Sequence, residues 1–201
     1  MNDVGLRIVK LGGSLLARPD WVAALTRWQE TRLPMQTLII VGGGIAADAV
    51  RTFDRSQNLE AQQSHELAIE AMGLSLQMAS AALRRTEVIS AIPSAATTEA
   101  TTQLLDVRPF LRTAEPEAAG MCLPRDWSAT SDSIAARVAD VIAAEELVLL
   151  KSTLPRADST WEQVAEQGIV DEHFPLAVKS VPIAYCVDLT DPGFTIFKPH
   201  R

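Results

Sequence analysis

Two residues of opposite charge stand in surroundings that suit phosphate chemistry. Lys10 ends a short apolar run and is followed almost at once by Gly12 and Gly13, in the stretch VKLGGS. Asp132 lies among hydroxyl side chains in TSDS, where an alanine-rich stretch begins. A lysine ammonium beside a glycine turn can stabilise phosphoryl oxygens, and a carboxylate can hold that ammonium in place. We therefore take Lys10 and Asp132 as candidate partners.

Asp132 also has a simpler interpretation as a helix cap. Ser, Thr and Asp accept hydrogen bonds from the unpaired N–H groups at a helix start, and an acid there suits the helix dipole. The two roles are compatible, because one carboxylate oxygen can accept backbone N–H groups while the other faces a cation. The sequence alone leaves both open.

A second glycine run, at 42–44, follows the apolar stretch TLIIV and precedes an expected helix at 45–54. Glycines at the carboxyl ends of parallel strands let the backbone approach a ligand, and helix N-termini present free N–H groups to an anion. Two such loops predict a polyphosphate site. Its backbone donors are expected to be Gly12, Gly13, Gly43 and Gly44.

Other nucleotide-binding designs fit the sequence less well. Residues 42–47 match a loose dinucleotide fingerprint, but they follow the second expected strand, and no acidic residue closes a strand about twenty positions later. The sequence also contains no Gly-x-x-x-x-Gly-Lys-Ser/Thr run, which excludes the common P-loop.

An alternating α/β chain must position these loops. Helices are expected in the alanine- and leucine-rich stretches, including 19–30, with Pro19 in its first turn and Trp21 and Trp28 packing on one face. The stretch 64–85 is apolar on several faces and is expected to pack against the sheet and another layer or subunit. A mobile surface loop is expected at 91–102. Strands are expected at 6–11, 37–41, 86–90, 146–150 and 183–187.

Composition narrows the class of protein. The 201 residues are 47% hydrophobic and 21% charged, which predicts one globular domain over 1–201. A net charge of −7 without basic runs argues against nucleic acid. Two distant cysteines predict neither a disulfide framework nor a protein metal site, and no apolar run is long enough for a membrane span. We expect a cytoplasmic protein.

Three motifs together resemble the amino acid kinase superfamily, which includes acetylglutamate, aspartate, uridylate and isopentenyl phosphate kinases. They are VKLGGSLL (9–16), IIVGGGIAADAVR (39–51) and TSDSIAARVA (130–139). Within the superfamily, LPRDWSATSDSIAA (123–136) and SHELAIEAMG (64–73) are most similar to the small-kinase branch of methanofuran biosynthesis. Kinases of that branch phosphorylate an aminomethylfuran-methyl monophosphate to its diphosphate.

The resemblance implies a three-layer αβα sandwich over a mainly parallel sheet and a site for ATP with Mg²⁺. Lys10 would contact the transferring phosphoryl group, and Asp132 would orient catalytic lysine side chains. The small-molecule acceptor would be a phosphate or a carboxylate, and self-association to at least a dimer is expected. Further candidates are Ser14 and Ser131 for the phosphates or nucleotide, and Gly42, Arg51, Arg55 and His65 for the acceptor.

The resemblance breaks down after the expected strand 146–150. Relatives carry an Asp-Val-Asp-Gly-like stretch there, whereas this chain has Lys151-Ser152-Thr153-Leu154-Pro155. Lys151 is either a second phosphate cation, like a similarly placed lysine in uridylate-type members, or a solvated lysine at a strand end. Two alternatives therefore stay open: a kinase for another phosphate or carboxylate acceptor, and a non-catalytic protein that binds a nucleotide or anion.

Overall fold

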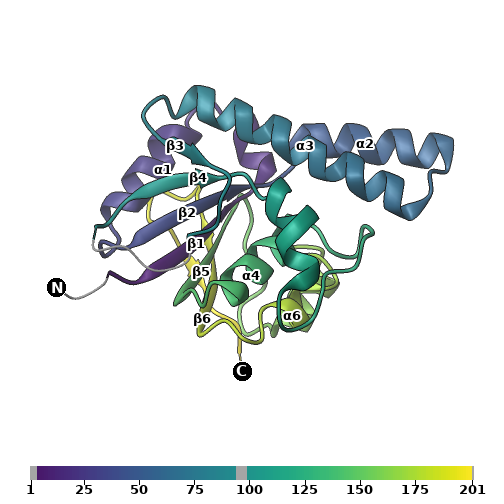
Figure 1. The fold of residues 1–201 in the computed structure, drawn as a ribbon. Coiled ribbons are helices and arrows are strands. Elements are labelled where there is room, and N and C mark those ends of the chain that lie inside the picture. The colour runs from purple at the N-terminus through teal and green to yellow at the C-terminus, as the bar shows by residue number, and fades with distance from the viewer. Residues whose placement is uncertain (1–3, 94–98, 201) are drawn as a thin grey trace.

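A single seven-stranded sheet organises the computed structural model, which describes residues 4–93 and 99–200 (Figure 1). The strand order is β3-β4-β2-β1-β5-β6-β7, and all neighbours are parallel except β7, which is antiparallel to β6. The strands are β1 (Leu6–Leu11), β2 (Gln36–Val41), β3 (Glu87–Ile89), β4 (Thr102–Leu105), β5 (Glu146–Lys151), β6 (Ile183–Asp188) and β7 (Ile196–Phe197).

Helices cover both faces of this sheet. One apolar core joins it to α1 and the C-terminal part of α3, and a second joins it to α4, α5 and α6. The helices are α1 (Trp21–Glu30), α2 (Gly44–Gln57), α3 (Ala61–Ala82), α4 (Ser131–Val141), α5 (Trp161–Glu166) and α6 (Phe174–Ala177), with short 3₁₀ turns at Gly13–Ala17 and Glu115–Glu117 and a π-helical turn at Phe110–Ala114. The predicted αβα sandwich with a mainly parallel sheet is confirmed.

The alternation of side chains along the strands decides which face the site occupies. In β1, Ile8 packs into the core beneath α4, whereas Val9 packs into the core beneath α1. Lys10 is two residues after Ile8 and therefore points to the α4 face. In β5, Leu149 also belongs to the α4 core, so Lys151 leaves the sheet on that same face. Two lysines from adjacent strands thus converge beneath one helix.

The strand predictions hold for the apolar runs and fail for the short or polar ones. The expected strand at 86–90 is shorter, since β3 has only three residues, and neither β4 nor β7 was predicted. The loop expected at 91–102 extends too far, because Thr102 already belongs to β4. Residues 94–98 of that loop lie outside the described residues.

The helix predictions need small corrections at their ends. Pro19 is not in the first turn of α1, because the helix begins at Trp21 after Asp20. Trp21 and Trp28 are both buried in the core on the α1 face, which confirms them as packing residues. The long helix α3 begins three residues earlier than predicted and ends at Ala82 instead of Arg85.

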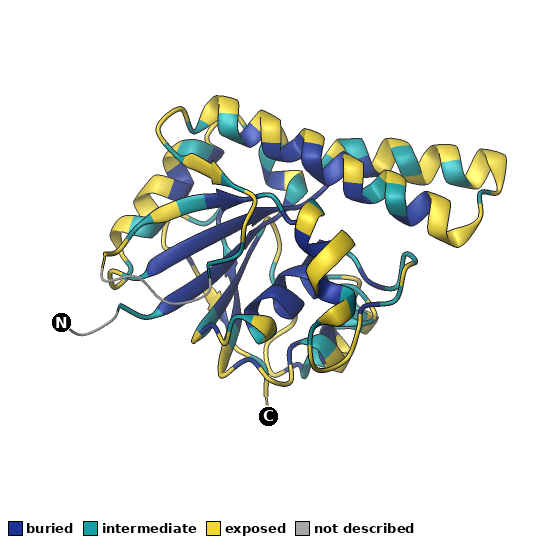
Figure 2. Ribbon diagram, in the orientation of Figure 1, coloured by how far each residue is buried: buried dark blue, intermediate teal, exposed yellow. Residues whose placement is uncertain are grey.

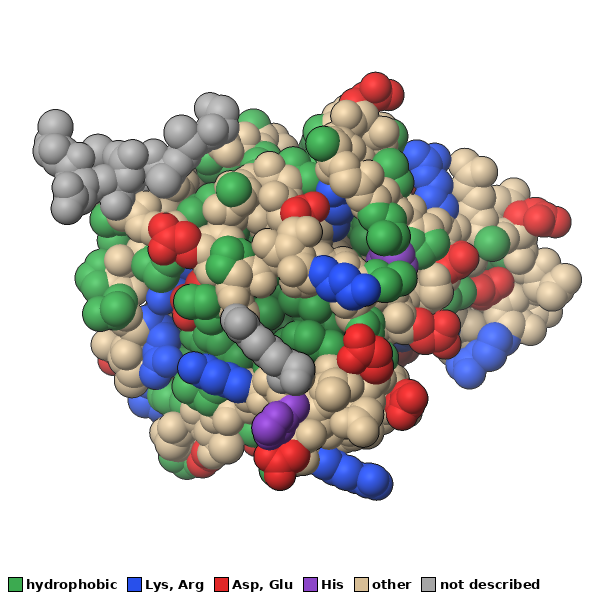
Figure 3. All heavy atoms as spheres, turned by 90° about the horizontal axis from the view of Figure 1, so that it is seen from below, with side chains coloured by type: hydrophobic (Ala, Val, Ile, Leu, Met, Phe, Trp, Pro, Cys, Tyr) green, Lys and Arg blue, Asp and Glu red, His purple; other side chains and the backbone are tan. Residues whose placement is uncertain are grey.

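The helices α2 and α3 lie side by side and extend beyond the sheet, where much of their surface is exposed (Figure 2). On α3 the exposed residues include Leu67, Leu74 and Met78. On the face in Figure 3, Lys and Arg side chains occur in separate places among acidic and apolar ones. Within residues 4–93 and 99–200, no helix combines the length and apolar character that a membrane span requires.

Candidate functional site

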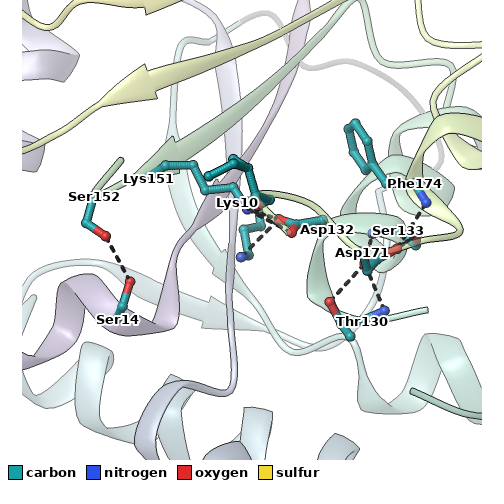
Figure 4. Close-up of polar contacts among 10 residues, drawn as sticks. Lys10, Ser14, Thr130, Asp132, Ser133, Lys151, Ser152, Asp171 and Phe174 are labelled. Atoms are coloured by element: carbon teal, nitrogen blue, oxygen red, sulfur yellow. Dashed lines mark hydrogen bonds and ion pairs between the residues drawn. The ribbon is translucent and has the colours of Figure 1, made fainter. Parts of the chain in front are cut away.

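A carboxylate bridged by two lysines forms the centre of the site (Figure 4). Asp132, near the start of α4, lies with Oδ1 at 3.0 Å from Nζ of Lys10 and with Oδ2 at 2.8 Å from Nζ of Lys151. Lys151 also donates a hydrogen bond of 2.6 Å to the carbonyl of Ile169. The side chains of Lys10 and Asp132 are each 7% exposed, and that of Lys151 is 11% exposed. The strand-end lysine is therefore part of the site.

Burial and charge set the protonation of this cluster. Burial lowers the pKa of Lys10 below the usual 10.5, because removal from water disfavours the ammonium, although the carboxylate of Asp132 opposes the shift. Burial alone would raise the pKa of Asp132, but the charges of Lys10 and Lys151 outweigh it, and the pKa lies below 3.8. Asp132 is thus ionised at neutral pH, and Lys10 loses its proton more readily than a solvated lysine.

Asp132 does not cap its own helix. The N-cap residue of α4 is Thr130, and no hydrogen bond from its side chain caps the helix. Instead, Asp171 accepts hydrogen bonds from the backbone N–H groups of Thr130 at 2.9 Å and Ser133 at 3.0 Å. Its carboxylate also accepts the hydroxyl hydrogens of both residues and the N–H of Phe174. The cap interpretation of Asp132 is therefore wrong, and Asp171 takes that role from another segment.

The two glycine loops contact each other beside this cluster. A Cβ on Gly13 would overlap the backbone nitrogen and Cα of Gly44, so the loops can meet only without a side chain at Gly13. Gly44 has φ of +51°, a conformation that favours glycine. A Cβ on Gly42 would lie only 3.0 Å from Oγ of Ser131 and 3.1 Å from Cε of Lys10. Close approach of backbone and lysine thus explains why glycines stand here.

The expected N–H donors divide into two groups. Gly12 lines the cavity, but its N–H donates to the carbonyl of Leu150 at 3.0 Å and is therefore not available as the expected donor to a phosphate. The N–H groups of Gly13, Gly43 and Gly44 have no acceptor among the residues described, as expected for the first residues of helical turns. Ser75 fixes the second loop by donating to the carbonyl of Gly43 at 2.7 Å.

A cavity of about 620 Å³ connects the lysine cluster with both loops. Ser14 and Ser131 line it, as predicted for phosphate-side residues. The hydroxyls of Ser14 and Ser152 lie 3.3 Å apart, which joins the first loop to the chain after β5 (Figure 4). Ser152 and its neighbour Thr153 were predicted only as a departure from the family pattern, and both line the cavity.

The part of the cavity wall formed by α2, α3 and the residues around the start of α4, called the acceptor end below, holds two of the predicted acceptor residues. Arg51 stacks over the ring of Trp127 at 4.5 Å and pairs with Asp48 at 3.1 Å. His65, on α3, is buried at the same end, and burial lowers its pKa. Arg55 does not belong here: it is exposed and absent from the cavity wall. Apolar residues complete this end, namely Ala68, Ile69, Met72, Ala129 and Ile134.

Two important residues escaped the sequence interpretation. Asp171 stands beside Glu172 in a short acidic stretch, so nothing local shows which carboxylate turns inward. A signal was available, because a helix start whose acid is held by lysines needs another acceptor for its unpaired N–H groups. Trp127 precedes that helix, and its ring N–H donates to Asp54 at 2.7 Å, which anchors it to α2.

Comparisons with known proteins show the fold. No family model matches the sequence, and no curated protein matches it significantly. The structure is similar to a UMP kinase from Bacillus anthracis, with TM-score 0.59, 12% identity and coverage of 96% of this chain and 90% of the other. It is also similar to a uridylate kinase from Archaeoglobus fulgidus, with TM-score 0.58, 15% identity and the same coverages. An aspartate kinase from Synechocystis gives TM-score 0.62 at 12% identity, covering 98% of this chain and 40% of the other.

Proposed function

We propose that this protein is an ATP-dependent phosphotransferase that acts on a small acceptor, most specifically an aminomethylfuran-methyl monophosphate that becomes the diphosphate. The observation that carries the proposal is the buried carboxylate of Asp132, bridged by Lys10 and Lys151 at the carboxyl ends of adjacent strands. The fold of the protein is shared with kinases of uridylate and aspartate.

The charge of the cluster calls for an anion. Two ammonium groups share one carboxylate, so the cluster carries an excess positive charge in a site largely removed from water. A buried charge is costly unless it is paired. The carboxylate of Asp171 also attracts the ammonium of Lys10, but this is the weakest of the charge effects there and its oxygens already accept backbone and hydroxyl hydrogens, so it offsets the excess only in part. A phosphoryl group entering the cavity would supply the missing negative charge.

The residues present can support in-line transfer by positioning and charge neutralisation. An oxygen of the acceptor phosphate would form a bond to the γ-phosphorus of ATP, as the bond to the β–γ bridging oxygen breaks and ADP leaves. Lys10 and Lys151 would stabilise the oxygens of the transferred group, with Asp132 holding both ammonium groups in place. A phosphate monoester is already ionised, so no general base has to remove a proton.

The free N–H groups of Gly13, Gly43 and Gly44 provide the places for ATP phosphates, since helix N-termini bind such anions. Mg²⁺ would neutralise part of the nucleotide's charge. Within residues 4–93 and 99–200 no group of three or more His, Cys, Asp or Glu side chains is arranged to hold a metal ion. The nucleotide phosphates themselves are therefore the ligands we propose for Mg²⁺.

The composition of the acceptor end supports a flat ring that carries a phosphate. Arg51 and His65 offer cationic or hydrogen-bonding groups, and Trp127 offers an aromatic face. Ala68, Ile69 and Met72 of α3 add an apolar surface, and Asp48 and Asp126 add two carboxylates to the wall. A furan ring with a phosphate monoester matches the aromatic face and the arginine, and the carboxylates of Asp48 and Asp126 on the wall could pair with its aminomethyl ammonium.

An acceptor panel tests the assignment directly. The purified protein would be incubated with Mg-ATP and, separately, the furan monophosphate, uridine monophosphate, isopentenyl phosphate, aspartate and acetylglutamate, while ADP and phosphorylated product are measured. We expect turnover of the furan monophosphate, its loss in Lys151→Ala, and its retention in Lys198→Ala, which removes a lysine outside the cavity. Turnover of another acceptor alone would contradict the specific assignment and keep the class. ATP binding without turnover of any acceptor would support the non-catalytic alternative.

We also propose that the protein forms at least a dimer through its long helical pair. Leu67, Leu74 and Met78 expose 42%, 47% and 48% of their surface on α3, and apolar patches of this kind are commonly buried by self-association. Light scattering at micromolar concentrations should give at least twice the chain mass of 21.8 kDa. A monomer throughout would contradict this.

A cytoplasmic location fits the free cysteines, Cys122 and Cys186.

A further inference from the structure

We propose that Asp171 is a positioning residue for phosphoryl transfer: by capping α4 from another segment, it leaves Asp132 free to hold both lysines. The proposal rests on the proposed function and adds a residue that neither the sequence motifs nor the comparisons assign. It is carried by the five hydrogen bonds that the Asp171 carboxylate accepts at the start of α4 and of α6 (Figure 4).

The N–H donors at the start of α4 need acceptors. A helix leaves its first N–H groups without partners, and the side chain best placed to accept them belongs to the N-cap residue. Thr130 occupies that position, but its hydroxyl donates to Asp171 and does not accept an N–H of its helix. The N–H of Ser133 donates to Asp171 as well. The requirement for a cap is thus met from outside the helix.

Asp132, two residues after the N-cap, is fully used in holding the lysines. Both of its oxygens are taken by ammonium groups, Oδ1 by Lys10 and Lys151 and Oδ2 by Lys151. If the carboxylate had to turn toward the backbone N–H groups, it would leave at least one buried ammonium without its partner. Asp171 removes that competition, so the helix can be capped and the lysines held at the same time.

The charge of Asp171 also acts on Lys10. The charged groups that face Lys10 are Asp132 on α4, Lys151 at the end of β5 and Asp171 just before α6. The carboxylate of Asp171 favours the protonated form of Lys10, in opposition to burial and to the neighbouring Lys151. Asp171 therefore acts on the reaction in two ways, through the orientation of Asp132 and through the protonation of Lys10.

A matched pair of substitutions separates this role from simple stabilisation. Asp171→Asn keeps an acceptor oxygen for the helix but removes the charge. Asp191→Asn is the control, because Asp191 also accepts backbone N–H groups, from Gly193 and Thr195, and its carboxylate lies outside the cavity. We expect Asp171→Asn to lower kcat about 100-fold, the scale of a displaced catalytic group, with a much smaller change in KM. Asp191→Asn should lower only the melting temperature.

The pH profile gives a readout that a structural role would not move. The reaction needs protonated Lys10, so the rate should fall as pH rises through the pKa of Lys10, which lies below 10.5. Without the charge of Asp171 that pKa drops further, and the alkaline limb should shift to lower pH. If Asp171→Asn keeps the wild-type kcat and pH profile and loses only stability, the proposal is wrong. If it does not fold, Ser133→Ala, which removes one donor to Asp171 and keeps its charge, should lower kcat on a smaller scale without shifting the alkaline limb, and a wild-type kcat in that variant would contradict the positioning role.

An NMR titration makes the result independent of the acceptor. The chain has only four lysines, at 10, 151, 179 and 198, so each side-chain signal can be assigned from a Lys→Arg variant. In the ligand-free protein, Asp171→Asn should lower the pKa of Lys10, and Asp191→Asn should not. That outcome would support the positioning role even if no acceptor in the panel is phosphorylated. An unchanged pKa of Lys10 together with an unchanged kcat would overturn it.

Discussion

The helices α2 and α4 both begin at the cavity, yet their N-termini are used in opposite ways. At α2, the N-cap is Gly43, and the N–H groups of Gly43 and Gly44 remain without acceptors in the part of the chain that is described. At α4, the N–H groups of Thr130, the N-cap residue, and of Ser133 donate to the carboxylate of Asp171. The first is therefore open to an anion from solution, whereas the second already contains one from the protein.

This difference shows how one backbone arrangement serves two purposes in phosphate chemistry. An open helix start attracts the phosphates of a ligand because its N–H groups and dipole favour negative charge. A filled helix start no longer competes for them, and it becomes a rigid base for a side chain that controls nearby cations. In this protein that side chain is Asp132, and the cations are Lys10 and Lys151.

The largest expected effect comes from replacing the carboxylate at the start of α4 or a lysine that it holds. Lys10→Ala and Asp132→Asn should each lower turnover by roughly 10²–10³-fold, the scale of losing one group that stabilises developing charge. Steady-state kinetics of purified, folded variants would measure this. Since Asp132 caps nothing, Asp132→Asn should change kcat far more than helix capping could explain. Comparable turnover in folded Lys10→Ala would rule out the assignment of the site.

The open helix start can be broken by a single methyl group. Gly13→Ala places a Cβ against the backbone of Gly44, and overpacking of that kind typically costs about 1–3 kcal/mol. If the loops separate to relieve it, the Kd for ATP should rise by about 10- to 100-fold. Calorimetric titration with ATP would measure the change. Gly193→Ala, whose Cβ would meet nothing closer than 3.5 Å, should bind ATP like the wild type. Equal affinity in both variants would argue against phosphate binding at this loop.

The open helix start was readable from the sequence because glycines constrain the backbone locally. A run of three glycines after an apolar strand leaves few conformations, and the structure shows the expected turn. The same locality made β1, β2, β5 and β6 predictable, since each is a largely apolar run. In contrast, β4 has the sequence TQLL and β7 has two residues, so they are defined by their neighbours in the sheet.

The need for a further acceptor at the start of α4 could be inferred, but its identity could not, because it depends on a contact across 38 residues or more. Asp171 and Glu172 are adjacent and similar, and only the folded chain decides which one reaches α4. The direction of Lys151 was partly predictable from the sequence. Its side chain follows the alternation of Leu147 and Leu149, so its direction could have been inferred once β5 was placed beside β1.

A moderate effect is expected at the far end of the cavity, on the exposed part of α2. Arg51→Gln should raise the KM of a phosphate acceptor by about tenfold. This is near the lower limit of the effect expected for losing a charged hydrogen bond, because the Arg51 side chain is 44% exposed and solvent weakens the interaction. ATP affinity should change little. Arg55→Gln, one turn further along α2 and outside the cavity, provides the control and should leave both values unchanged. An equal rise of KM in the two variants would point to a general effect of charge.

The smallest expected effect tests the filled helix start at its edge. Thr130→Val removes one of the hydroxyls that donate to Asp171 and keeps the backbone N–H, so the carboxylate loses a single bond. A hydrogen bond to a charged group contributes about 1.5–3 kcal/mol, which for a chain of this size corresponds to a fall in melting temperature of about 3–12 °C. Thr160→Val is the control, because Thr160 caps α5 with its own side chain and does not line the cavity. Both variants should lose stability by calorimetry, but only Thr130→Val should also lower kcat, by less than tenfold. Equal kcat values would mean that Asp171 tolerates the loss and that its remaining bonds suffice to hold Asp132 in place.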